Sequence, residues 1–179
     1  MTEVICKTMI LVEKIIGNIN SDPHFKEKYR DMLKSDHVEK IEMTRLECER
    51  ARIRKVSDKG TDLAITITPG SRIHDGDIVL LTDEKMIIVN RASENVATIY
   101  LKGNISYEQL FEITIKLGHT IGNMHRPIKV TSIKVSFPIQ SQSEIELFQK
   151  LLYNLRDNID IKQENIIFEP DRGYDILGH

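Results

Sequence analysis

The chain has 179 residues, with 25 Lys+Arg and 27 Asp+Glu, which give a formal net charge of −2. This length suits one domain or two small ones, and a content of 40% hydrophobic and 29% charged residues is typical of a globular chain that buries a core. The near-neutral charge argues against a general nucleic-acid binder, which needs clustered Lys and Arg. No apolar run approaches the roughly 20 residues of a membrane-spanning helix, and the first residues do not form a secretory signal. With two cysteines that make no CxxC pair, these features predict a cytoplasmic protein.

The first half of the chain carries mostly strand signals. Residues 9–16 predict a strand that ends at the turn Gly17-Asn18, and Asp22 and Pro23 predict the N-cap and first position of a short helix that reaches about Ser35. The many short strands separated by turns predict a small β-sandwich or barrel over residues 1–92. The further strands are expected at 38–43, 51–56, 63–67, 78–81 and 86–89, with turns at 57–60 and 75–77.

The pattern changes near residue 95. Ser106 predicts the N-cap of a helix with Leu110, Ile113, Leu117 and Ile121 on one face, and a capping box over 143–146 predicts a second helix whose apolar face carries Ile145, Phe148, Leu151, Leu152 and Leu155. Strands are expected at 96–101, 127–130, 133–137 and 159–168. The order β-α-β-β-α-β predicts a ferredoxin-like domain over residues 95–168, followed by a flexible tail over 169–179. The expected fold class is therefore α+β with two domains.

The sequence contains none of the standard catalytic signatures, such as GxSxG, HExxH or a P-loop. Asp75 and Asp77 resemble a metal or acid–base pair, but their neighbours favour a hairpin turn, beside which His74 is expected to be exposed. Gly122-Asn123 is expected to close the first helix of the second domain, because both residues tolerate the left-handed conformation.

The histidines near the end of that helix are the candidate metal ligands. His125 follows the helix end directly, and His119 is expected to point away from the apolar face. Imidazole is the commonest metal ligand and binds in its neutral form, so affinity is expected to fall as the pH drops through about 6.5. From the residues alone, a capping or surface role for His125 and a tail role for His179 are favoured over ligation.

Several segments resemble the UreE family of urease accessory proteins, which are nickel metallochaperones. In the first half these are 50–54, 58–60 and 69–80, which include Pro69-Gly70 and Asp75-Gly76-Asp77. In the second half, 117–127 resembles the family's Gly-Asn-Arg-His motif, and Phe168-Glu-Pro170 precedes a final histidine. The resemblance runs in the same order over nearly the whole chain from Met9.

The resemblance implies a peptide-binding-like N-terminal domain that binds partner proteins and a ferredoxin-like metal-binding domain. It implies a homodimer, with possible tetramers, in which His125 of both chains binds Ni(II) as cargo, with His179 as an extra ligand and His119 in reserve. Zn and Cu are expected to compete. The implied partners are the urease GTPase and scaffold accessory proteins and urease apoprotein, and the chain would not be an enzyme.

Three departures from the family pattern qualify this resemblance. Met124 stands where the family usually has Arg, residues 142–144 lack the histidines that many members carry, and the final segment has one histidine in place of a His-rich run. One ion per dimer is therefore expected, with at most a weak second site and without storage of many ions. Two alternatives remain open: a protein-interaction adaptor with no metal, and, with little support, a small hydrolase that uses His119 and His125.

Overall fold

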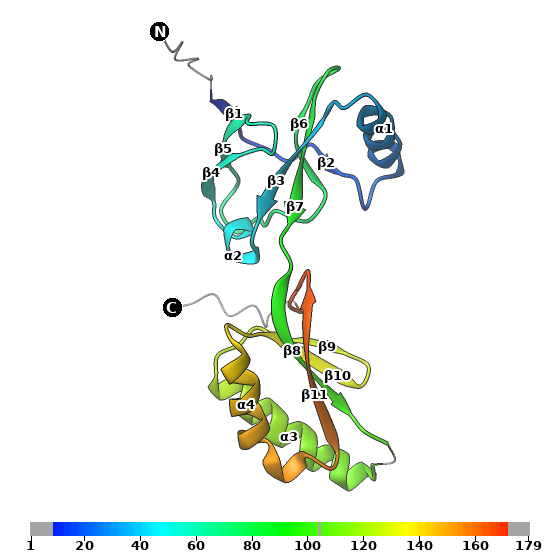
Figure 1. The fold of residues 1–179 in the computed structure, drawn as a ribbon, viewed down its shortest axis with the longest axis vertical. Coiled ribbons are helices and arrows are strands. Elements are labelled where there is room, and N and C mark those ends of the chain that lie inside the picture. Colours follow the sequence, from blue (N-terminus) through cyan, green and yellow to red (C-terminus); the bar gives the residue numbers. More distant parts are fainter. Residues whose placement is uncertain (1–8, 104, 172–179) are drawn as a thin grey trace. The chain divides into compact units, whose positions relative to one another are not determined.

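The computed structural model describes residues 9–103 and 105–171, and the chain divides between Ala92 and Ser93 into two compact units. Figure 1 shows strands and helices in both units, and each unit has its own hydrophobic core. The α+β class expected from the sequence is confirmed.

The first unit is built on two sheets. The three-stranded sheet has the order β1-β5-β4, and the four-stranded sheet has the order β2-β6-β7-β3. β1 runs parallel to β5 and β3 parallel to β7, whereas the other neighbours are antiparallel. The strands are β1 (Ile10–Val12), β2 (Gly17–Asn18), β3 (Val38–Met43), β4 (Arg52–Val56), β5 (Asp62–Thr66), β6 (Asp77–Leu81) and β7 (Met86–Arg91).

Alternating side chains of the four-stranded sheet serve two cores. On β7, Ile87 and Val89 join the core shared with the three-stranded sheet, whereas Met86 and Ile88 pack with Met32 of helix α1 (Pro23–Lys34). The helix begins as expected, with the Asp22 side chain accepting a hydrogen bond from the backbone N–H of His24 at 2.9 Å. The β-rich unit therefore has three layers, because α1 covers the outer face of one sheet.

Gly17 and Asn18, expected as a turn, instead form β2 and pair with Ile78 and Asp77 of β6. The reason lies in the contact between Gly17 and Phe25. A Cβ atom at position 17 would come within 2.1 Å of the Phe25 ring, so only glycine allows α1 to approach this closely. Gly17 is therefore required by packing against Phe25 and not by a turn, although the local sequence favoured a turn.

Gly17→Ala is expected to lower the free energy of unfolding by about 1–3 kcal/mol, because the Phe25 ring must leave its place to admit the methyl group. Urea unfolding followed by circular dichroism measures the change. Gly118→Ala is the matched control, since a Cβ there meets nothing within 4 Å and raises helix propensity by about 1 kcal/mol. Equal effects of the two substitutions would contradict the packing requirement.

The second unit has one four-stranded sheet of order β11-β8-β10-β9, in which all neighbours are antiparallel. Its elements follow one another as β8 (Glu94–Leu101), α3 (Tyr107–Asn123), β9 (Lys129–Thr131), β10 (Lys134–Pro138), α4 (Gln142–Leu151), the 3-10 helix η1 (Tyr153–Leu155) and β11 (Ile159–Ile166).

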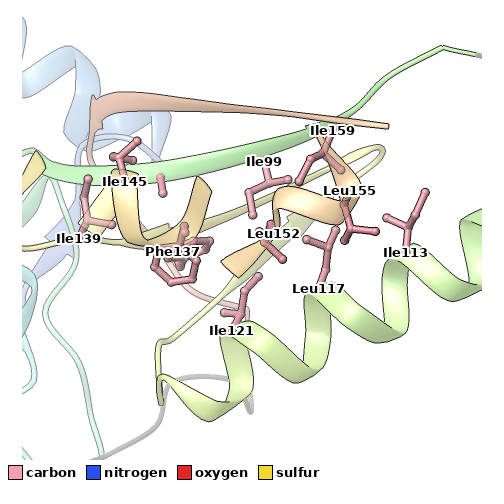
Figure 2. Close-up of a cluster of buried hydrophobic side chains, with 12 residues drawn as sticks. Ile99, Ile113, Leu117, Ile121, Phe137, Ile139, Ile145, Leu152, Leu155 and Ile159 are labelled. Atoms are coloured by element: carbon pink, nitrogen blue, oxygen red, sulfur yellow. The ribbon is translucent and has the colours of Figure 1, made fainter. Parts of the chain in front are cut away.

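The core of the second unit lies between the sheet and the two helices. Figure 2 shows Ile113, Leu117 and Ile121 of α3 directed toward side chains of the sheet and of the α4–η1 segment. The rings of Phe137 and Phe148 meet at 4.6 Å between centroids, and both residues are fully buried. The expected inner face of α3 is confirmed at these three positions, which give the helix a fixed orientation against the sheet.

Two short-range expectations were wrong. The Ser143 capping box does not start α4, which begins at Gln142 with Ser141 as an N-cap that makes no side-chain cap bond. Instead, Glu144 accepts a hydrogen bond from the backbone N–H of Gln140 at 3.0 Å. Leu151, expected on the apolar face, is 52% exposed, because α4 ends there and η1 carries Leu155 into the core.

Helix α2 (Arg45–Cys48) was missed. A capping box at its start, in which Thr44 and Glu47 satisfy each other's backbone N–H groups, stabilises this single turn. The turn is too short to show helical periodicity in the sequence.

Candidate metal site at the end of helix α3

His125 occupies a special backbone position just beyond the end of α3. Its φ angle is 48°, in the left-handed region, and its backbone N–H donates to the carbonyl oxygen of Gly122 at 3.0 Å. Helix α3 ends at Asn123 and Met124 is its C-cap, so the Gly122-Asn123 pair closes the helix as expected. The left-handed conformation, however, lies at neither residue of this pair but at His125. Gly or Asn occupies such a position more readily, so the histidine is kept here at a backbone cost of about 1 kcal/mol.

The chain directly after His125 is anchored to the start of α4. The guanidinium of Arg126 donates through Nη2 to Glu144 Oε1 at 2.7 Å, and the other carboxylate oxygen of Glu144 accepts from Gln140. The exposed imidazole of His125 therefore stands on a backbone that is held on both sides. Such a position presents a ligand to solvent or to a partner without a large loss of backbone entropy.

His119 is exposed on the outer side of α3, in the expected direction. Its Nε2 atom lies 3.0 Å from the side-chain nitrogen of Asn123. His179 lies outside the described residues. Within 9–103 and 105–171, no group of three or more His, Cys, Asp or Glu side chains is placed to hold a metal ion. A site at His125 would thus need ligands from residues 172–179 or from a second chain.

An exposed apolar stripe leads along α3 to these histidines. Tyr107, Phe111 and Ile115 are 80%, 62% and 55% exposed, and their four-residue spacing continues to His119. These residues lie outside the buried face predicted for this helix, although their four-residue spacing is visible in the sequence. A row of large apolar side chains on a surface marks an interaction site.

The carboxylate of Glu164 is engaged by the sheet of the second unit. Thr98 Oγ1 donates to it at 2.6 Å and Tyr100 Oη at 2.8 Å. The hydrogen bond from Thr98, and after it the one from Tyr100, hold the pKa of Glu164 below its ordinary value. The same carboxylate raises the pKa of Tyr100. Glu164 therefore serves the sheet and is a poor candidate for a metal ligand.

Asp75 and Asp77 stabilise the fold of the first unit. Asp77 accepts from the backbone N–H of His74 at 2.7 Å and from the Asn18 side chain at 2.8 Å, and Asp75 accepts from the backbone N–H of Arg91 at 2.9 Å. The favoured turn interpretation is confirmed, and His74 is exposed as expected. The turn is not part of a hairpin, however, because β5 and β6 belong to different sheets.

Met124, at the position where the resembled family usually has Arg, forms the C-cap of α3 and is half-buried against the core of the second unit. It contributes packing at the base of the loop that carries His125. Met124 plays no electrostatic role of the kind open to an Arg, because its thioether carries no charge.

These features define a two-unit α+β protein with a β-rich first unit and a second unit that exposes histidines at a helix end. Comparison with known proteins identifies the family of this chain. Residues 12–92, within the first unit, match the family model described as UreE urease accessory protein, N-terminal domain. The chain belongs to the UreE family of urease accessory proteins.

Three relatives illustrate the match, and each is named a urease accessory protein UreE. The protein from Edwardsiella ictaluri is 28% identical over 76% of this chain and 61% of its own length, and that from Yersinia enterocolitica is 32% identical over 73% and 57%. The UreE 1 of Pseudomonas syringae pv. tomato is 23% identical over 83% of this chain and 96% of its own length. The chain thus spans about 60% of the length of the relatives from Edwardsiella ictaluri and Yersinia enterocolitica. Their names describe accessory proteins, in agreement with the expectation that the chain is not an enzyme.

No helix within the described parts of the chain is long and apolar enough to cross a membrane.

Proposed function

We propose that the chain is a nickel carrier of urease maturation, which binds Ni(II) between two copies of itself. It would deliver the ion to urease apoprotein in the cytoplasm, together with the urease GTPase and scaffold accessory proteins. The observation that carries the proposal is His125, an exposed imidazole held in a left-handed conformation on an anchored backbone, in a chain of the UreE family.

The topology of the second unit supports its assignment as a ferredoxin-like metal-binding domain. The elements follow in the order β8-α3-β9-β10-α4-β11, and the sheet order β11-β8-β10-β9 places the first and third strands in the centre. Both helices contribute to one core, so the end of α3 lies at the surface of a rigid unit. Ligands on such an element are held more precisely than ligands on a free loop.

The apolar stripe supports a homodimer. A two-fold contact joins one surface patch to its own copy, so a contact made by Tyr107, Phe111 and Ile115 between two α3 helices that run in the same direction would bring together their C-terminal ends. Two His125 side chains would then form half of a site, which His179 or His119 completes. A carrier needs such an open site, because a closed site of four fixed ligands releases its ion poorly. Zn(II) and Cu(II) are expected to compete, and a shared ion would also join dimers into tetramers.

The first unit is proposed as the part that binds partner proteins. Its outer strands β1 and β4 form the two edges of the three-stranded sheet, and they expose Leu11 and Val56. Exposed edge strands with apolar side chains are suited to pairing with an extended segment of another protein.

Isothermal titration with Ni(II) tests the proposal. The wild type is expected to bind one ion per two chains. His125→Asn keeps a residue that tolerates the left-handed conformation and removes the imidazole, and is expected to weaken the affinity on the order of 100-fold. His24→Asn, at an exposed histidine of the first unit, is the matched control and is expected to bind as the wild type does.

Full nickel affinity in His125→Asn would show that the primary ligand is elsewhere. A wild type whose mass and melting temperature do not respond to Ni(II) would contradict the carrier function and favour the adaptor alternative.

A further inference from the structure

An apolar groove lies in the second unit between α3 and the strands β9 and β10. Its volume is about 650 Å³, within the range of roughly 300–1,000 Å³ that ligand clefts span. Leu117 and Ile121 of α3 line it, together with Ile128, Val130 and Ile133 around β9 and β10. Ile133 is 61% exposed. Open apolar surface of this extent is expected to be covered.

Two glycines of α3 widen the groove. Gly118 and Gly122 both line it, and a Cβ atom added at either position would meet nothing within 4 Å. Glycine inside a helix is less stable than alanine by about 1 kcal/mol, so each residue costs stability that the packing of the described residues does not require. A segment that occupies the groove and lies against the α3 backbone accounts for glycine at both positions.

The chain itself leaves the described structure at the rim of this groove. Asp171 donates its backbone N–H to the carbonyl oxygen of Ile128 at 2.9 Å, and its carboxylate accepts from the backbone N–H of Val130 at 2.7 Å. Ile128 and Val130 both line the groove. Residues 172–179 therefore start beside it, and eight residues reach up to about 27 Å when extended.

We propose that residues 172–179 of the same chain occupy the groove. The segment contains Tyr174, Ile176 and Leu177, three apolar side chains for an apolar cleft. It also supplies acceptors, because the buried Nε of the groove-lining Arg126 has no hydrogen-bond partner among the described residues and a backbone carbonyl or Asp175 would satisfy it. The docked segment runs beside His125, since Gly122 and Arg126 on either side of that residue both line the groove.

Limited proteolysis of the full, metal-free chain tests the docking. Trypsin cleaves the Arg172–Gly173 bond only when the segment is released, and mass spectrometry follows the loss of residues 173–179. Ile133→Asp places a charge on the groove wall and is expected to speed this cleavage about tenfold. Leu11→Asp, at a residue that is 60% exposed in the first unit, is the matched control and is expected to leave the rate unchanged.

Two further variants keep the test decisive if Ile133→Asp disturbs folding. Ile176→Asp changes the segment and neither described core, whereas Gly122→Leu adds a side chain at a groove-lining position where a Cβ atom meets nothing within 4 Å. Both are expected to speed cleavage at Arg172 to the same degree. Cleavage at one rate in the wild type, the two groove variants and the segment variant would overturn the proposal.

If Ile133→Asp instead lowers the mass in sedimentation while cleavage is unchanged, a second copy occupies the groove and the proposal is wrong. Because no metal is present, these outcomes are independent of whether the chain carries nickel.

Discussion

Phe111→Asp is expected to convert the proposed dimer into a monomer and to weaken nickel binding on the order of 100-fold, although residue 111 is no metal ligand. Phe111 lies in the middle of the exposed stripe on α3, two helical steps of four residues before His119. A carboxylate buried in an apolar contact between two copies is costly to desolvate, and the two-fold contact doubles that cost. When the two copies are separate, each chain can offer the ion only its own His125 and not that of the second copy.

Sedimentation equilibrium at micromolar concentration, with and without Ni(II), measures this effect. Leu46→Asp is the matched control, because Leu46 is 61% exposed on α2 of the first unit and Phe111 is 62% exposed. The control is expected to keep the wild-type mass and affinity. A dimer that persists in Phe111→Asp would place the contact between copies away from the α3 stripe.

Glu39→Ala is expected to lower the free energy of unfolding by about 2 kcal/mol at neutral pH, because it removes the centre of a buried polar network. Glu39 of β3 accepts a hydrogen bond from Ser57 and pairs through Oε1 with Lys85 Nζ at 2.7 Å. Lys85 also donates to Thr61 Oγ1 at 3.0 Å. The network thus joins β3, the turn after β4 and the turn before β7, and links the two sheets of the first unit.

The same carboxylate makes stability depend on pH. Burial by itself would raise the pKa of Glu39, but the hydrogen bonds from Lys85, Ser57 and Thr61 together outweigh it, so the pKa lies below its ordinary value. A lowered folded-state pKa stabilises the fold above the unfolded value of about 4.3, and this contribution is lost as the pH falls through the folded-state pKa.

Urea unfolding between pH 7 and pH 3 should therefore show the difference between wild type and Glu39→Ala shrinking toward the acid end. Glu42→Ala, an exposed residue of the same strand, is expected to change stability by less than about 0.5 kcal/mol. A difference that stays constant over this range would show that the carboxylate charge contributes nothing.

Signals that are local in the chain predicted much of the fold. Asp22 and Pro23 marked the start of α1, Ser106 marked the start of α3, and alternation along β5 marked its buried face. These features depend on a few neighbouring residues, since a cap satisfies backbone groups within one turn and alternation follows from strand geometry. The resemblance to the UreE family was confirmed, because several motifs in a fixed order are unlikely to coincide by chance.

Where a distant residue decides the outcome, sequence reasoning was wrong. Gly17 was expected in a turn and lies in β2 because the Phe25 ring needs the space. Ser143 was expected as a cap, but Glu144, held by Arg126, takes part in closing the start of α4. Asp75 and Asp77 were expected in a hairpin, whereas their carboxylates join segments of different strands.

The sequence by itself determined the α+β class, the family and the choice of His125, His179 and His119 as candidate ligands. Only the tertiary structure decided that the left-handed residue after α3 is His125, that the apolar stripe before His119 is exposed, and that Asp171 leads the chain to an apolar groove lined by Gly122 and Arg126. The physical reason is that exposure, backbone conformation and grooves depend on contacts between elements far apart in the sequence, which local patterns do not encode.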